Sequence, residues 1–183
     1  FFTLKGEVDA LLEQLNVHPA TYVADTKNPS YHPGRCADIM IDGKKLGVIG
    51  QIHPLVAEGY GISGEVYVAE LDFTGLQSAL AQERVFHSLP KFPTVSRDLA
   101  LVCDEAMTVG MLEACIKKAG GKLLRSIQLF DIYRGPGIAP GKKSVAFSLE
   151  LRADDRTLTD EDTTGVTNAV LEKLKNDLGV TLR

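Results

Sequence analysis

The sequence predicts an α+β protein built from antiparallel sheets, and three observations support this fold class. Several short segments alternate apolar and polar residues with a period of two, which is typical of strands. Asp42-Gly43 separates two of these segments, and this dipeptide favours the tight turn of a β-hairpin. Longer segments repeat apolar residues at helical spacing, which indicates amphipathic helices packed on one side of the strands.

The first half of the chain opens with an expected helix over residues 2–16, because Leu4, Val8 and Leu12 lie on one helical face. The strands that follow surround the Asp42-Gly43 turn. Pro54 can start a short helix that ends at a glycine. The strands expected in this half cover residues 22–24, 37–41, 45–50 and 66–71, and the short helices cover 54–60 and 73–80.

The sequence of the second half of the chain predicts a regular series of strands and helices. Gly120-Gly121 ends its first helix, and Thr159 with Asp162 begins the second in the manner of a capping box. The order β-α-β-β-α-β is that of the ferredoxin-like sandwich, in which two helices cover one face of a four-stranded antiparallel sheet. The expected elements are strands 98–103, 123–133, 142–151 and 180–182 and helices 109–119 and 159–178.

These patterns predict two domains, residues 1–86 and residues 87–183. Pro90 and Pro93 lie within 84–96, a mixed polar and apolar stretch that suits a connection between domains. The 183-residue chain is 44% hydrophobic, and neither a membrane-spanning apolar run nor a signal-peptide pattern occurs in it. We therefore expect no membrane association and a cytoplasmic location. Because the chain begins with Phe1-Phe2, we expect it to be part of a longer protein.

Charge is divided unevenly along the chain, whose overall net charge is −4. Residues 1–86 hold six Lys and Arg against eleven Asp and Glu, whereas residues 87–183 hold fourteen against thirteen. Within 117–143, seven cations accompany a single anion, Asp131. Such a cluster is compatible with nucleic-acid binding, although clustered surface lysines are also common on a merely solvated face.

The strand from Leu129 to Tyr133 carries the main candidate site. A strict period of two places Leu129, Asp131 and Tyr133 on one face and Phe130 with Ile132 on the core face. In the following strand, Ser144 joins the same open face as Tyr133. An exposed aromatic side chain among small residues, flanked by lysines, is suited to stacking on an unpaired nucleobase. The alternative is that Tyr133 packs at an edge or under the loop 135–141.

Enzymatic signatures are absent from the sequence. There is no P-loop, GxGxxG, GxSxG or HExxH motif, and the three well-separated cysteines form no CxxC pair. Three of the four histidines precede proline, and none has a partner at metal-ligand spacing. We therefore predict no catalytic residue, no metal ligand and no cofactor-binding residue in this chain.

Four motifs in the second half closely resemble the ferredoxin-fold anticodon-binding domain that ends bacterial phenylalanyl-tRNA synthetase β chains. They are residues 90–101, the Leu-Phe-Asp-Ile-Tyr run of 129–133, the Gly-Lys-Lys-Ser-Val-Ala run of 141–146, and the Arg-Thr-Leu-Thr run of 156–159. The closing residues 179–183 match as well. The first half resembles the end of a catalytically inactive domain of these chains, related to class II synthetase cores, through residues 2–6, 32–37, 47–54 and 67–71.

This resemblance implies an enzyme of two α and two β chains that joins phenylalanine to tRNA(Phe), with ATP and magnesium used by the whole enzyme. The active site would belong to the α subunit, so this chain would be non-catalytic by itself and hold no cofactor. The motifs imply anticodon contact by Asp131, Tyr133 and Ser144. With them we expect the neighbouring cations to contact RNA, namely Arg134, Lys142 and Lys143.

Two other functions remain open from the fold alone, because one fold hosts several activities. A small-molecule module that senses amino acids shares this element order, and its ligand would bind at a strand–helix edge or a dimer interface. An enzyme of acylphosphatase type would need a phosphate-binding loop after the first strand of the second domain. Asp104-Glu105 makes that loop acidic, which disfavours phosphate binding.

Overall fold

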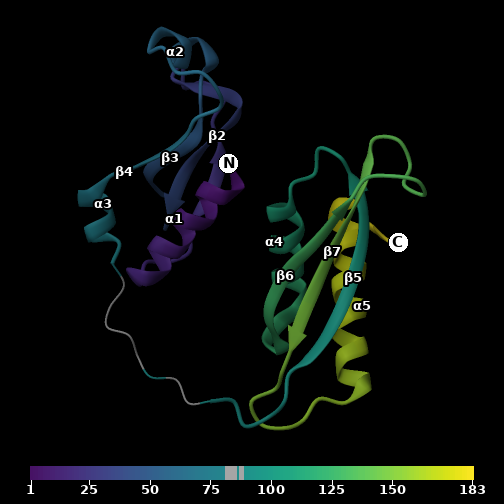
Figure 1. The fold of residues 1–183 in the computed structure, drawn as a ribbon. Coiled ribbons are helices and arrows are strands. Elements are labelled where there is room, and N and C mark those ends of the chain that lie inside the picture. Colours follow the sequence, from purple (N-terminus) through teal and green to yellow (C-terminus); the bar gives the residue numbers. More distant parts are fainter. Residues whose placement is uncertain (81–85, 87–88) are drawn as a thin grey trace. The chain divides into compact units, whose positions relative to one another are not determined.

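A computed structural model describes residues 1–80, 86 and 89–183 (Figure 1). The chain divides into two compact units, Phe1–Phe86 and His87–Arg183, each described here by itself. The connection expected at residues 84–96 lies partly outside the described residues. From Val95 onward the chain is already a strand, so the first strand of the second unit begins three residues before the expected Asp98.

The first unit is a four-stranded antiparallel sheet in the order β1-β2-β3-β4. Helix α1 packs on one face of this sheet, where Val8 and Leu12 meet the fully buried Ile39 and Ile49 (Figure 1). The elements are α1 Phe2–Gln14, β1 Thr21–Ala24, β2 Tyr31–Ile41, β3 Lys44–Ile52, α2 Pro54–Gly59, β4 Tyr67–Leu71 and α3 Phe73–Ser78.

The expected hairpin turn between β2 and β3 is confirmed. Asp42 and Gly43 both have positive φ, at 50° and 76°, as a two-residue hairpin turn of this twist requires. Strand β2 begins at Tyr31, six residues before the expected Ala37. Its pairing with β3 is irregular between Tyr31 and Cys36, and that irregularity hides the strand from a search for simple alternation.

The second unit has the sheet order β6-β7-β5-β8, which confirms the ferredoxin-like arrangement. All of its strand pairs are antiparallel. The elements are β5 Val95–Asp104, α4 Val109–Gly120, a 3₁₀ turn Gly121–Leu123, β6 Leu124–Tyr133, β7 Lys142–Leu151, α5 Asp160–Leu178 and β8 Thr181–Leu182.

Both helices of this unit start at capped residues. Thr108 accepts the backbone N–H of Met111 at the start of α4. At α5, Thr159 and Asp162 form the full capping box that the sequence indicates. The Arg156 guanidinium pairs with the Asp162 carboxylate, and this contact holds the pKa of Asp162 well below its usual range.

Helices α4 and α5 cover one face of the second sheet (Figure 1). Their apolar residues enclose a core in which Leu101, Phe147, Leu112 and Leu174 are fully buried. No helix in the described part of this unit covers the opposite face of the sheet. This uncovered face determines where a ligand can reach the sheet. No helix among the described residues is long and apolar enough to cross a membrane.

Candidate nucleic-acid interface

The uncovered face takes its shape from a β-bulge in β6. Leu129 pairs with Phe147, but the next pair along the ladder joins Asp131 to Ala146, so Phe130 is the extra residue. Ile132 then pairs with the buried Val145. The bulge changes which residues face the core on either side of it.

The expected faces of this strand are therefore correct for some residues and wrong for others. Leu129 packs against the core, not with Asp131, and Phe130 is 56% exposed. Ile132 packs against the core as expected. A strict period of two fails here because one extra residue in the strand reverses the alternation at that point.

Asp131, Tyr133 and Ser144 share the uncovered face, as expected. Tyr133 pairs directly with Ser144 in the ladder, and Asp131 lies beside Ala146. Asp131 is exposed, whereas Ser144 and Ala146 are only 3% and 9% exposed although no helix covers this face. Longer side chains must therefore lie across the centre of the face.

Tyr133 is half-buried and fixed at its hydroxyl end. Its hydroxyl donates a hydrogen bond to the Pro136 carbonyl oxygen at 3.2 Å. A Cβ on Gly135 would lie 2.6 Å from the same hydroxyl, so only glycine leaves room for the ring in this position. The loop thus touches the end of the Tyr133 side chain, as the alternative interpretation expected.

Arg183 lies over the Tyr133 ring, with the guanidinium carbon 4.9 Å from the ring centroid. This distance is typical of a cation–π contact. The Arg183 backbone N–H donates to the carbonyl oxygen of Ala100 in β5, beside the edge strand β8. Tyr133 belongs to β6, at the other edge, so the contact spans the intervening strands.

The cations that were expected to flank Tyr133 have partners inside the protein. Lys142 pairs with Asp104 at 2.8 Å, and Arg134 pairs with Glu105 at 2.8 Å. Lys143 was expected to contact RNA, but its side chain is buried. It is 7% exposed and donates to the Glu105 carbonyl oxygen, because the side chain of a residue that precedes Ser144 points to the helix-covered side of the sheet.

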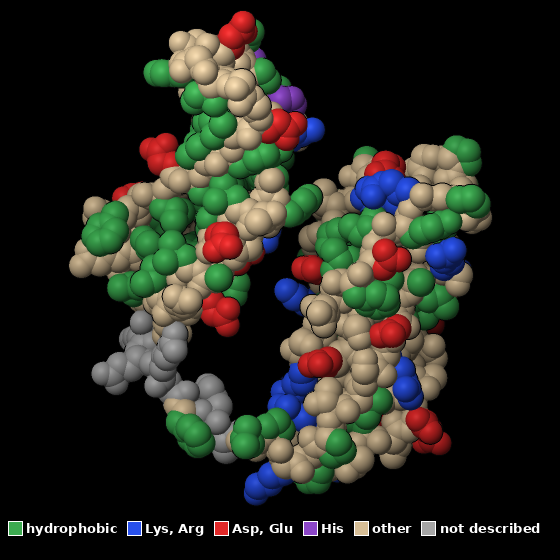
Figure 2. All heavy atoms as spheres, in the orientation of Figure 1, with side chains coloured by type: hydrophobic (Ala, Val, Ile, Leu, Met, Phe, Trp, Pro, Cys, Tyr) green, Lys and Arg blue, Asp and Glu red, His purple; other side chains and the backbone are tan. Residues whose placement is uncertain are grey.

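Acidic side chains that are distant in sequence offset the basic stretch 117–143. Asp104 and Glu105 come from the end of β5, and Asp154 pairs with Arg125 at 2.7 Å. On the uncovered face itself, Asp98, Asp131 and Glu150 are exposed, and Figure 2 shows acidic side chains along this side of the unit. The folded surface is therefore much less cationic than the sequence window indicated.

The same ion pairs bear on the acylphosphatase-type alternative. Asp104 ends β5 and Glu105 begins the loop that would have to bind phosphate, and each holds a cation in a salt bridge. Two carboxylates at this position repel a phosphate. This arrangement gives the loop a structural role, since it ties the end of β5 to the hairpin of β6 and β7.

Two exposed residues, one at the bulge and one over Tyr133, were missed by sequence reasoning. Phe130 was assigned to the core because no sequence signal marks a bulge inside an apolar run. Arg183 was not singled out, although the ferredoxin-like order pairs the closing strand with the first strand and could have placed it on this sheet. Arg183 thus adds a cation to the face that carries Asp131 and Tyr133.

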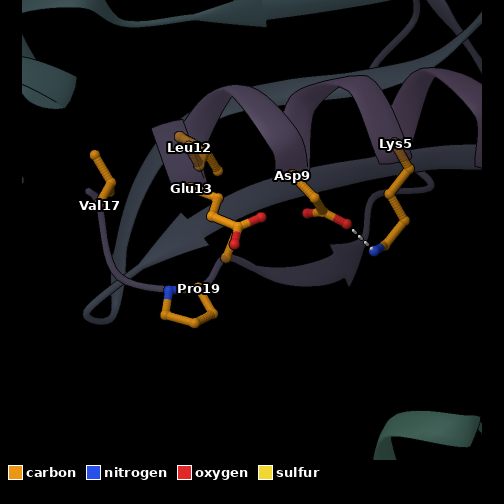
Figure 3. A pocket seen from close by; sticks show the side chains of 7 residues that line it. Lys5, Asp9, Leu12, Glu13, Val17 and Pro19 are labelled. Atoms are coloured by element: carbon orange, nitrogen blue, oxygen red, sulfur yellow. Dashed lines mark hydrogen bonds and ion pairs between the residues drawn. The ribbon is translucent and has the colours of Figure 1, made fainter. Parts of the chain in front are cut away.

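The first unit holds a separate surface cavity of about 380 Å³ beside α1 (Figure 3). Asp9, one of the residues that line it, is engaged on both carboxylate oxygens. The Lys5 ammonium donates to one Asp9 oxygen at 2.6 Å, and the Tyr22 hydroxyl donates to the other at 2.6 Å. Burial and this carboxylate raise the pKa of Tyr22. The Lys5, Asp9 and Tyr22 side chains thus already bond to one another, which leaves them few hydrogen-bonding groups for a ligand.

We searched the described residues of both units for clusters of side chains that could bind a metal ion. Within residues 1–80, 86 and 89–183, no three His, Cys, Asp or Glu side chains gather where they could hold one ion.

The second unit is an α+β domain whose four-stranded sheet leaves one face free for a ligand. A family model described as "Ferredoxin-fold anticodon binding domain" matches residues 90–183, and the chain belongs to that family. A second model, described as "Phenylalanyl tRNA synthetase beta chain CLM domain", matches residues 1–73. The resemblance that the sequence motifs indicate is thereby confirmed for both halves of the chain.

Curated relatives agree along the whole chain. It is 46% identical to a protein named phenylalanine–tRNA ligase beta subunit in Symbiobacterium thermophilum, 43% to that of Bacillus subtilis and 42% to that of Clostridium acetobutylicum. Each match covers 100% of this chain but only 20–23% of the relative. The chain therefore spans between a fifth and a quarter of the length of these relatives.

Proposed function

We propose that residues 87–183 bind the anticodon stem-loop of tRNA(Phe) through the uncovered face of their sheet. One observation carries this proposal: Asp131 and Tyr133 stand together on a helix-free sheet face, in a domain of the anticodon-binding family. Single-stranded RNA loops are commonly recognised by aromatic side chains that stack on splayed bases and by polar groups that bond base edges. The face supplies both kinds of group.

Each named residue has a distinct part in this proposal. Tyr133 belongs to the stacking surface, and exposed Asp131 accepts hydrogen bonds from base N–H groups. Ser144 is buried beneath this surface and supports the Tyr133 ring from the neighbouring strand. Arg134 and Lys142 are partly exposed and meet phosphates at the rim, in exchange for their present carboxylate partners. Lys143 anchors the loop at Glu105 and does not contact RNA.

The surface charge predicts how binding responds to salt. Phosphate contacts release counterions, so affinity falls with salt in proportion to the number of contacts. Because Arg134 and Lys142 are paired with carboxylates, we expect few such contacts and a shallow dependence. A steep fall of RNA affinity with salt, as many phosphate contacts would give, would contradict the proposal that the protein mainly contacts the bases.

The proposal is tested with the 183-residue chain and a fluorescent anticodon stem-loop, titrated by anisotropy. Tyr133→Ala should weaken binding by about 1–3 kcal/mol, the usual worth of one base–aromatic stack. Phe73→Ala is the matched control, because Phe73 is a 77% exposed aromatic side chain of the first unit. Equal affinity of the Tyr133→Ala variant and the unchanged chain would overturn the assignment, and so would loss of affinity in the control.

We propose further that the chain acts as part of the β subunit of a phenylalanine–tRNA ligase. In this assembly two α and two β subunits join, and the α subunit carries the site that uses ATP and magnesium. Residues 1–86 would be the end of a catalytically inactive class II-like domain. The names of the relatives support this division of labour. The first unit supports it as well, because the Lys5, Asp9 and Tyr22 side chains bond to one another.

This division of labour has a direct test. The purified chain should form no phenylalanyl-tRNA from phenylalanine, ATP and tRNA(Phe), whereas the assembled enzyme should. A phenylalanine-dependent exchange of pyrophosphate into ATP by the chain, abolished by Asp9→Asn, would show that the first unit has its own active site. A small-molecule sensing role would instead appear as saturable binding of free phenylalanine to the chain.

A further inference from the structure

The Arg183 side chain reaches across the uncovered face to meet Tyr133. The sheet order is β6-β7-β5-β8, and neighbouring strands lie about 4.8 Å apart. Strand β6, which carries Tyr133, and strand β8, which leads to Arg183, are thus separated by three strand spacings, about 14 Å. Yet the guanidinium carbon is 4.9 Å from the ring centroid, so the two side chains extend toward each other over β7 and β5.

Small residues under this path make the contact possible. Ala100 accepts the Arg183 N–H, Ala146 pairs with Ala100 in the ladder, and Ser144 pairs with Tyr133. Ala146 and Ser144 are buried on a face without helices, as expected if the two long side chains lie over them. A larger residue at any of these three positions would occupy the space that the Arg183–Tyr133 pair uses.

Arg183 also differs in its partners from the other cations near this face. Arg134 and Lys142 are held by carboxylates, and Lys143 is buried. For Arg183 the contacts shown among the described residues are its backbone bond to Ala100 and its position over an aromatic ring. A guanidinium is planar and always charged, so one that stacks on a ring has a second planar surface for another partner.

We propose that Arg183 forms the outer layer of the recognition surface, so that an RNA base stacks on the Arg183 guanidinium while Tyr133 supports it from below. This inference rests on the proposed anticodon binding and adds a residue to it. The bound base meets a cation–π pair, not a bare tyrosine ring. Guanidinium planes stack on nucleobases as aromatic rings do, and the positive charge offsets the nearby carboxylate of Asp131.

The alternative is a lid, in which Arg183 occupies the place of the base and must leave. The two arrangements predict opposite changes in RNA affinity when the Arg183 side chain is removed. If Arg183 is a stacking layer, its removal weakens RNA binding. If Arg183 is a lid, its removal strengthens binding, because the base no longer competes with the guanidinium for the ring.

The experiment measures affinity of the 183-residue chain for the anticodon stem-loop, with the same stem lacking its loop as the RNA control. We expect Arg183→Ala to weaken stem-loop binding about tenfold, in the range of one lost stack. Arg183→Lys keeps the charge but not the plane, and should restore little of the loss. Tyr133→Phe keeps the ring and should bind nearly as well as the unchanged chain.

A double-mutant cycle tests whether the two side chains act as one unit. Once Tyr133 is alanine, Arg183→Ala should have a much smaller effect than in the unchanged chain, because the guanidinium has lost its support. The inference would be overturned if the effects of the two alanine substitutions on affinity were fully additive. It would also be overturned if Arg183→Ala bound RNA more tightly, or if Arg183→Lys bound as well as the unchanged chain. Each of these outcomes would leave the proposed anticodon binding intact. No binding by the unchanged chain would instead overturn the proposed function and this inference with it.

Discussion

Tyr133 occupies its place only because residue 135 has no side chain. A Cβ at Gly135 would lie 2.6 Å from the Tyr133 hydroxyl, and the flexible end of that side chain would have to move. We expect Gly135→Ala to shift the ring and weaken stem-loop binding, with little change in melting temperature. Gly110→Ala is the control, since nothing lies within 4 Å of a Cβ there. Unchanged RNA affinity in Gly135→Ala would show that the ring position does not matter for binding.

Phe130 and Phe147 give a second prediction at the residue scale. Phe130 stands at the bulge and is 56% exposed, whereas Phe147 is fully buried between the helices and the sheet. Phe147→Ala should cost about 3–5 kcal/mol of unfolding free energy, the usual loss for a buried ring. Phe130→Ala should cost no more than about 1 kcal/mol. Urea denaturation measures both, and a larger loss for Phe130 would place the bulge elsewhere.

At the scale of elements, the start of α5 should make stability depend on pH. Folding lowers the pKa of Asp162 through its bonds with Arg156 and Thr159, so the stabilisation is complete above the ordinary aspartate pKa of about 3.9. It is lost as the pH falls below that value. Asp162→Asn should therefore destabilise the chain at pH 7, and the difference should shrink below about pH 4. Asp155→Asn in the preceding loop is the control, and a pH-independent difference for Asp162→Asn would exclude the charge mechanism.

At the scale of the whole molecule, each of the two units has its own main hydrophobic core among the described residues. Ile39 is fully buried in the first unit, and Leu112 is fully buried in the second. Ile39→Ala and Leu112→Ala should each cost about 2–5 kcal/mol, but in different unfolding transitions. Hydrogen exchange followed by mass spectrometry locates each loss. If either substitution lowered protection equally in both units, the chain would unfold as one cooperative block, contrary to this prediction.

Most of the architecture could be predicted from local patterns. The Asp42-Gly43 turn, the capping box at Thr159 and the β-α-β-β-α-β order all follow from residues close together in the chain. The open face was also predicted in part, since Asp131, Tyr133 and Ser144 do share it. These features could be predicted because turn geometry, helix capping and strand alternation depend on a few neighbouring side chains.

The sequence by itself thus determined the two-part α+β organisation and the face on which Tyr133 stands. Only the tertiary structure decided that a bulge exposes Phe130, that Lys143 is buried, and that Arg183 covers Tyr133. It also decided that Asp104 and Glu105 offset nearby cations of the basic stretch. Each of these depends on strand pairing between residues far apart in the chain, and local periodicity contains no information on the register of such pairs.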